Sequence, residues 1–408
     1  MTTTSSKPPA PIPAVVRSRR DLESRGVRFL PAGATFPTSL PIQEDGATYS
    51  MAQEAAWLDA EHFAVGRWDG SLSIFRFNPG RSAGPLITTT ASSPSSEGVQ
   101  MITWLTPRSF ASSNDAGSIV VWRSAPGRTW AALQQAAMLG YDASFGAANS
   151  GDAFVLGSSL YLVAGHANGY LTIWAGAADG TDLQFVRSVD VRSARPVNPW
   201  NLHNVRGVAL IQNAGATALL ITGSEDGDLC VVRVPDGTVV SRTVYNPAAQ
   251  RGINSIAAWG RNLLVANCAV GPDDKNLWYY RMDPSAGTIE LRDRINLRVN
   301  PNAPQVFNFC TVWGFYQGGA CFFSSTEEGA LWMGTVDKSQ LSIIGYQEVT
   351  GPLGSALAFS ARGRLVTVSH DLYEFITTTA PAEVTDAHPE RLPDDEPEPQ
   401  AESRGEGP

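Results

Sequence analysis

The stretch ITGSEDGDLCVV, residues 221–232, reads as two apolar strands joined by a short acidic turn that ends in glycine. Apolar and small residues fill the segments on both sides of the turn, as expected for strands that pack on a core. Gly227 stands where a tight turn needs a backbone conformation that other residues adopt at a cost. The stretch therefore predicts a β-hairpin.

This strand, turn and strand phrase recurs along the whole chain. Its seven copies share a small or acidic turn followed by an apolar strand: WDGSLSIF (68–75), DAGSIVVW (115–122), ANGYLTIW (167–174), EDGDLCVV (225–232), KNLWYY (275–280), EEGALWM (327–333) and SHDLYEF (369–375). The copies lie on average about 50 residues apart, and a fixed period of this size indicates a repeat fold. We interpret the 408 residues as one repeat domain with tails.

Each period holds four predicted strands. Two apolar strands come before the third, which follows the turn, and the fourth is more polar, as in LQFVRSVDV (183–191). Buried inner strands and a solvated, charged outer edge are what a propeller blade requires. We therefore predict an all-β fold, a seven-bladed β-propeller of four-stranded antiparallel blades. Large residues near the ends of the first strands are expected to form a packed ring between the sheets: Trp57, Trp104, Leu156, Ile211, Trp259, Trp313 and Phe359.

The chain resembles the WD40-repeat family over about residues 48–379. The best match to that family's strand, turn and strand run is the stretch at 221–232, and the best third-strand endings are Trp122 and Trp174. A kelch repeat has a similar period, but its doubled glycine does not recur here. The resemblance implies a scaffold that holds a partner protein or peptide over the face bearing the turns.

WD40 blades carry a hydrogen-bonded network of His, Ser or Thr, Asp and Trp. The resemblance implies that His203, Thr222 or Ser224, and Asp226 fill three of these places in the fourth blade, where Val232 replaces the Trp. The sequence carries the whole set in no blade, so the resemblance depends on the period and the strand pattern.

The ends of the chain differ in composition from the predicted propeller, residues 23–379. Residues 1–22 and the acidic segment 380–408, with nine acidic residues and two arginines, are predicted to be disordered tails. The last period ends at LYEFITTT (372–379) without a fourth strand. We expect GVRFL, residues 26–30, to supply that outer strand and close the ring.

Charge and cysteine usage bound the function. The net charge is -9, most of it in the acidic tail, so the propeller lacks the basic stripe that nucleic acid requires. The four cysteines lie in apolar strands without metal-ligand spacing, and a hairpin would place Cys310 opposite about position 325 rather than opposite Cys321. Without a signal peptide or an apolar run of about 18 residues, a cytoplasmic protein without membrane contact is expected. The scarcity of lysine suggests a GC-rich, bacterial genome.

No catalytic signature is present. The sequence lacks the HExxH, GxSxG and Walker motifs, and we predict no catalytic, cofactor or metal site. His166 and His370 occupy turns, and a metal site made from them with an acidic residue is the less favoured interpretation.

We predict an interaction scaffold or adaptor for a protein or peptide partner. We expect the loops that depart from the period to determine which partner binds. These loops are 124–151, which has room for a short helix, 192–204 between blades 3 and 4, and the acidic 271–276. The candidate partner-binding residues are Trp200, Arg67, His166, Glu225 and Glu327. Two alternatives stay open: a propeller hydrolase or lyase with its site in the central channel, and a regulatory subunit of a partner enzyme.

Deletion of residues 1–36 should lower the melting temperature if residues 26–30 supply the closing strand, because blade 7 would lose a strand. Truncation after Ala380 should leave a folded propeller. Thermal unfolding of both deletions checks this, and an unchanged melting temperature for the first would contradict the closure.

Overall fold

The structure is a computed structural model, and it describes residues 52–77, 86–90, 98–125, 129–194, 203–213, 215–245, 251–271, 273–316, 319–337, 339–348, 356–368, 372–376 and 390–392. Within these ranges the chain forms strands and one 3₁₀ helix, η1 (Ala143–Phe145). The all-β prediction is confirmed, and the short helix expected in 124–151 is this single 3₁₀ turn. In the part of the chain that is described, no helix is long and apolar enough to cross a membrane.

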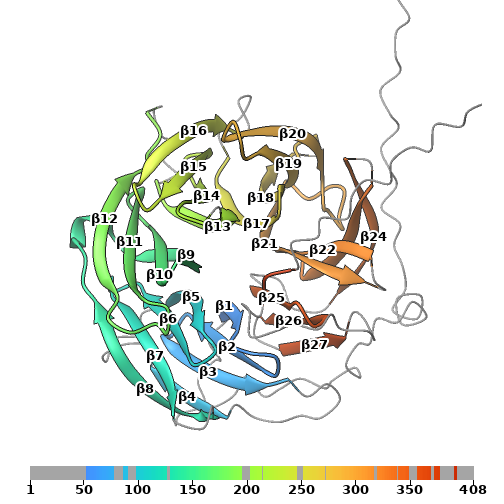
Figure 1. The fold of residues 1–408 in the computed structure, drawn as a ribbon. Coiled ribbons are helices and arrows are strands. Elements are labelled where there is room, and N and C mark those ends of the chain that lie inside the picture. Colours follow the sequence, from blue (N-terminus) through green and yellow to red (C-terminus); the bar gives the residue numbers. More distant parts are fainter. Residues whose placement is uncertain are drawn as a thin grey trace, which may run out of the picture.

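The strands are arranged as seven blades around a ring (Figure 1). The innermost strands are β1 (Ala52–Trp57), β5 (Val99–Thr106), β9 (Ala148–Leu156), β13 (Val205–Asn213), β17 (Ile253–Trp259), β21 (Gln305–Tyr316) and β25 (Ala356–Ser360). The second strands are β2 (His62–Arg67), β6 (Ser109–Asn114), β10 (Ser159–His166), β14 (Ala218–Ser224), β18 (Asn262–Val270), β22 (Gly319–Thr326) and β26 (Arg364–Val368).

The outer halves of blades 1 to 6 follow the predicted pattern, and the third strand of blade 7 is also described. The third strands are β3 (Ser71–Arg76), β7 (Ile119–Ala125), β11 (Tyr170–Ala177), β15 (Asp228–Val234), β19 (Leu277–Asp283), β23 (Ala330–Asp337) and β27 (Leu372–Ile376). The fourth strands are β4 (Ile87–Thr90), β8 (Thr129–Leu139), β12 (Gln184–Asp190), β16 (Thr238–Val244), β20 (Thr288–Ile295) and β24 (Gln340–Glu348). In blade 3, strand β12 is largely exposed and β10 largely buried, so solvent exposure increases outward.

Five of the seven predicted turns contain a glycine in the left-handed region. In each of these turns the glycine N–H donates to the carbonyl three residues earlier: Gly70 to Arg67, Gly117 to Asn114, Gly169 to His166, Gly227 to Ser224 and Gly329 to Thr326. These hydrogen bonds confirm the hairpin between the second and third strands. These five turns all join second to third strands and therefore lie on one face of the ring, here called the turn face.

The indole side chains of three inner strands fasten neighbouring blades together. Each donates to a backbone carbonyl at the inner strand of the preceding blade: Trp104 Nε1 to Leu58 O at 3.0 Å, Trp313 Nε1 to Ala257 O at 3.2 Å, and Trp57 Nε1 to Ala358 O at 3.2 Å. The last bond joins blade 1 to blade 7, whose inner strands are in contact. The predicted ring of large residues is buried except at Ile211, which is partly exposed.

The sequence predicted seven separate four-stranded blades, but the strands of blades 5 and 6 belong to one continuous sheet. Strand β18 extends beyond its partner β19, and Cys268–Val270 pair with Gln305–Phe307 of β21. Residues 273–276, which precede β19, are irregular. The expected register at Cys310 is confirmed, because this residue lies opposite Ser325, and all four cysteines are free thiols.

Several predictions fall on residues outside the described ranges. These are the N-terminal tail 1–22, the closing strand at 26–30 and most of the acidic tail 380–408. Blade 7 therefore has three described strands, β25 to β27. Residues 390–392 of the tail are described and contact the propeller.

Replacement of Trp57 by alanine should reduce the free energy of unfolding by about 3–5 kcal/mol, because it removes a fully buried indole and the bond between blades 1 and 7. Trp68 is 59% exposed on the turn face, and Trp68→Ala should change stability by less than about 0.5 kcal/mol. Urea denaturation measures both. Equal losses for the two variants would show that the Trp57 contacts do not hold the ring.

Candidate functional site

A polar pocket lies on the turn face where blade 3 meets blade 4. Its volume is about 330 Å³, and it is lined by Asp190, Arg192, Ser193 and His203. Asp190 ends the outer strand β12, and His203 comes shortly before the inner strand β13. The chain that leaves blade 3 and the chain that enters blade 4 therefore both line this pocket.

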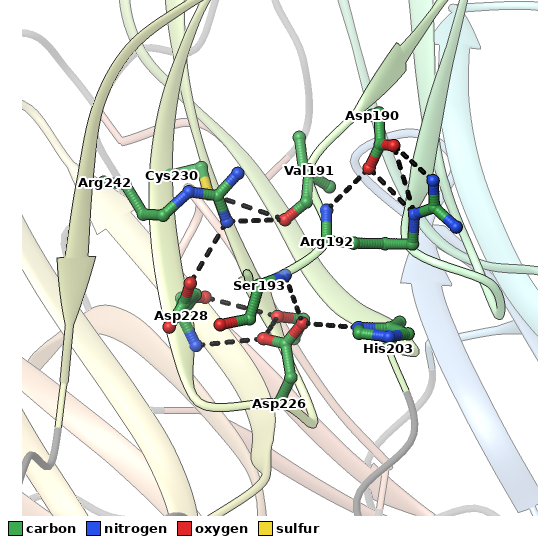
Figure 2. Close-up of polar contacts among 10 residues, drawn as sticks. Asp190, Val191, Arg192, Ser193, His203, Asp226, Asp228, Cys230 and Arg242 are labelled. Atoms are coloured by element: carbon green, nitrogen blue, oxygen red, sulfur yellow. Dashed lines mark hydrogen bonds and ion pairs between the residues drawn. The ribbon is translucent and has the colours of Figure 1, made fainter. Parts of the chain in front are cut away.

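The carboxylate of Asp226 organises the floor of the site (Figure 2). Asp226 is fully buried in the turn between β14 and β15. Its Oδ2 accepts from the Ser193 backbone N at 3.0 Å and lies 3.0 Å from His203 Nδ1. Its Oδ1 accepts from the Ser224 hydroxyl and from the Asp228 backbone N. A buried carboxylate needs several donors of this kind, and here they come from both blades.

This arrangement confirms the predicted His, Ser and Asp contacts of the fourth blade. Ser224, and not Thr222, provides the hydroxyl that donates to Asp226. Because a carboxylate only accepts, His203 Nδ1 carries the hydrogen and Nε2 is the acceptor of the neutral ring. Val232, in the place of the Trp, is buried in the apolar cluster between blades 3 and 4.

A second buried carboxylate holds the segment beneath the pocket. Arg242 Nη1 donates to Asp228 Oδ2 at 3.1 Å and to the Val191 carbonyl at 2.8 Å (Figure 2). Asp228 is nearly inaccessible to solvent, so the arginine compensates its charge. Burial raises the pKa of the neighbouring Cys230 thiol to about 12, which makes it unreactive at neutral pH.

The rim of the pocket is an exposed ion pair. Arg192 Nε donates to Asp190 Oδ1 at 3.0 Å, and the guanidinium lies 4.8 Å from the centre of the Tyr170 ring. The hydrogen bonds from Arg192 lower the pKa of Asp190, so this carboxylate is ionised at neutral pH. The rim therefore presents both signs of charge and an aromatic edge.

Glycine at position 169 is required by the shape of this site. Gly169 has a φ of 79° and belongs to the turn between β10 and β11. A Cβ atom there would lie 2.2 Å from Arg192 Cγ and 2.9 Å from His203 Cβ. The recurring turn glycine of blade 3 thus leaves the room that the two pocket residues occupy.

Two of the sequence-predicted partner-binding residues, Arg67 and His166, are buried and are therefore not available on the surface. Arg67 is 3% exposed, because its guanidinium points into blade 1, where Nη1 donates to the Ser73 hydroxyl at 2.9 Å. His166 is fully buried and makes bonds to the Gly146 carbonyl and the Thr172 hydroxyl. Burial lowers its pKa to about 4, so this histidine stays neutral and serves the packing of blade 3.

The two acidic candidates are partly exposed and lie on different blades. Glu225 precedes Asp226 and accepts from Arg206 Nε at 2.8 Å, beside the pocket. Glu327 lies in the turn of blade 6, where it accepts from the Phe307 N, and burial raises its pKa. Trp200 lies outside the described residues, and its role stays a prediction.

Sequence reasoning missed three of the four pocket residues, Asp190, Arg192 and Ser193. It did single out loop 192–204, and the resemblance did assign His203. The sequence does not reveal that Asp226 is buried and that its carboxylate contacts both ends of this loop, at Ser193 and His203.

The hydroxyl nearest the pocket floor is not placed as a serine nucleophile would be. The Ser224 hydroxyl donates to Asp226, whereas a serine nucleophile would donate to the imidazole that activates it. Among the described residues, no group of three or more His, Cys, Asp or Glu side chains could hold a metal ion. The pocket offers a guanidinium, a carboxylate and an imidazole to hydrogen-bonding groups of a partner.

Replacement of Asp226 by asparagine should destabilise the protein by about 3 kcal/mol, because an amide NH₂ would face buried N–H donors. Asp236 is exposed and pairs with Arg233, so Asp236→Asn should cost less than about 1 kcal/mol. Chemical denaturation compares the two variants. A loss at Asp226 as small as that at Asp236 would show that the network does not hold the loop.

No protein-family model matches the sequence, and no curated protein matches it either. Solved structures do. U3-55K shares 12% identity and a TM-score of 0.60, with 86% of this chain and 98% of that chain covered. The WD40 repeats of RRP9 give 12% and 0.60, covering 86% and 97%, and the WD40 β-propeller domain of Doa1 gives 10% and 0.56, covering 81% and 93%. The predicted resemblance is confirmed at the level of the fold, which is that of WD40-repeat propellers.

Proposed function

We propose that this propeller is an interaction module that binds a protein or peptide partner on its turn face, at the pocket between blades 3 and 4. The observation that carries the proposal is the buried Asp226, which fixes Ser193 and His203 in place beneath an exposed Arg192 and Asp190. Side chains that are already held in position lose little conformational freedom when a partner binds. The WD40-type fold supports a scaffold function in general.

The chemistry of the rim favours a polar, charged segment of the partner. Arg192 would donate to a carboxylate or a backbone carbonyl, and Asp190 would accept from a basic side chain or a backbone N–H. The Tyr170 ring beneath Arg192 adds a flat surface on which a partner side chain would pack. Arg and Tyr are among the residues that most often dominate binding energy at interfaces.

We place this module in the cytoplasm, with neither nucleic acid nor membrane as its partner. A regulatory subunit of a partner enzyme would use the same turn face. Trp200 belongs to the loop that joins Arg192 to His203, and we propose it as a further contact.

The test is co-purification of the tagged protein from its native cells at physiological salt, followed by mass spectrometry. We expect one stoichiometric partner that binds Arg192→Ala about 30-fold more weakly, equivalent to about 2 kcal/mol. Arg187→Ala is the matched control, because Arg187 is an exposed arginine on the outer strand β12 of the same blade, away from the pocket. It should leave binding unchanged.

Two outcomes would contradict the proposal. A partner that binds both arginine variants as tightly as the wild type would place the interface elsewhere on the ring. The absence of any stoichiometric partner would contradict the interaction function itself and favour the channel enzyme.

A further inference from the structure

Three residues of the acidic C-terminal segment make specific contacts with the inner strands of the propeller. Glu390 Oε1 accepts from the backbone N of Trp57 at 2.7 Å. Arg391 donates to Asp152 Oδ1 at 3.1 Å and to the Ala153 carbonyl at 2.5 Å. These partners lie on β1 and β9, the inner strands of blades 1 and 3.

Leu392 completes the set with apolar contacts on the other side of the ring. It packs against a cluster formed by blades 6 and 7, which includes Phe323 and Phe359. It also packs against a cluster formed by blades 5 and 6, which includes Trp259 and Trp313. Three consecutive residues therefore contact blades 1, 3 and 5 to 7.

Only the centre of the ring satisfies these contacts together. Three residues of extended chain span at most about 11 Å. The blades involved lie on opposite sides of the ring (Figure 1). A segment that reaches all of them lies between the inner strands, near the axis of the propeller.

The contacts lie toward the face opposite the turn face. Trp57 is the last residue of β1, and the hairpin that follows leads into β2, which ends at the turn face. Trp259, in the cluster behind Leu392, is likewise the last residue of an inner strand. The segment is therefore separate from the pocket at Asp226.

The propeller contributes groups that suit this occupant. Asp152 accepts from the Leu210 N of the next blade at 2.7 Å, which holds its carboxylate toward Arg391. Strand β1 is the inner edge of its sheet, so its Trp57 N–H is available to the Glu390 carboxyl group. Arg391 forms an ion pair with Asp152, Glu390 accepts a hydrogen bond from a backbone N–H, and Leu392 packs on an apolar surface.

Arg391 supplies the cationic partner of Asp152 at the ring centre. Removal from water raises the pKa of Glu54 to about 7 and that of Glu390 to about 8, and the negative charges of Glu54 and Asp152 contribute to the second shift. Without its occupant, the centre of the ring keeps the carboxyl groups of Glu54 and Asp152, the two groups whose charges act on Glu390. An occupant that lacked a basic side chain would leave Asp152 without its cationic partner.

We propose that the centre of the ring is a second peptide-binding site, selective for a short acidic–arginine–apolar segment, and that the chain's own residues 390–392 occupy it in cis. The site goes beyond the turn-face interaction and does not depend on it. A partner with the same pattern of side chains would compete with the C-terminal segment for this site.

The test uses full-length protein and a fluorescent peptide with the sequence DAHPERLPDDE, residues 386–396. In the variant Arg391→Glu, loss of the ion pair with Asp152 and repulsion from that carboxylate should release the segment and free the site. Fluorescence anisotropy should then show that the peptide binds this variant at least about tenfold more tightly than it binds the wild type, whose site is filled. Equal binding to both proteins would overturn the proposal.

Matched controls separate the site from a general charge effect. The chain variant Arg404→Glu makes the same change of charge in the same acidic segment and should behave as the wild type. A peptide that carries Arg391→Glu should bind neither protein. If it binds the Arg391→Glu chain as tightly as the unmodified peptide, the selectivity for arginine is wrong.

Native tryptic cleavage of the wild type gives an independent measurement. Each cleavage rate is divided by the rate of the same bond in a synthetic peptide. The bond after Arg391 should then be cut at least about tenfold more slowly than the bond after Arg404. Asp152→Asn should remove this protection. Equal relative rates in the wild type would overturn occupancy of the ring centre.

Discussion

The structure depends on the closure of the ring. The apolar side chains of each blade face a neighbouring blade on either side, so an unclosed array would leave two apolar faces in water. The bond from the Trp57 indole to the Ala358 carbonyl joins the first blade to the last. Trp104 and Trp313 repeat this contact at other seams, which shows that the closure uses the same interaction as the interior of the ring.

The closed ring carries different chemical groups at its turn face and at its centre. At the turn face, hairpins project from rigid strands, and the seam between blades 3 and 4 is fastened by a buried carboxylate rather than by an indole. The network at Asp226 therefore stabilises the seam and shapes the pocket above it. At the ring centre, the free edges of inner strands offer backbone groups and the carboxylate of Asp152, and residues 390–392 use both.

The sequence was sufficient for what is local and repeated. The turn glycines, the order of the strands and the opposition of Cys310 and Ser325 follow from the alternation and spacing of residues within one blade. The contact between His203 and Asp226 was predictable because the WD40 resemblance supplies the pattern. The choice of Ser224 over Thr222 was not, since it depends on which hydroxyl faces the turn.

What the sequence did not predict depends on contacts between distant residues. Arg67 looks like an exposed turn residue, but Ser73 and Phe75 on the next strand hold it inside the blade. The pairing of β18 with β21 joins strands of two different blades, whereas the repeat pattern describes pairing within one blade. Likewise, Glu390 and Arg391 belong to a segment whose composition predicts disorder. Their positions depend on contacts with the distant residues Trp57 and Asp152.

Hydrogen–deuterium exchange of the intact protein tests the central claim, the closed ring, most directly. If the ring is closed, peptides from β1 and β25 should be as strongly protected as those from the interior strands β9 and β13, because all share the same packed seams. Fast exchange confined to β1 and β25 would mean that the ring opens between its first and last blades, and it would contradict the account.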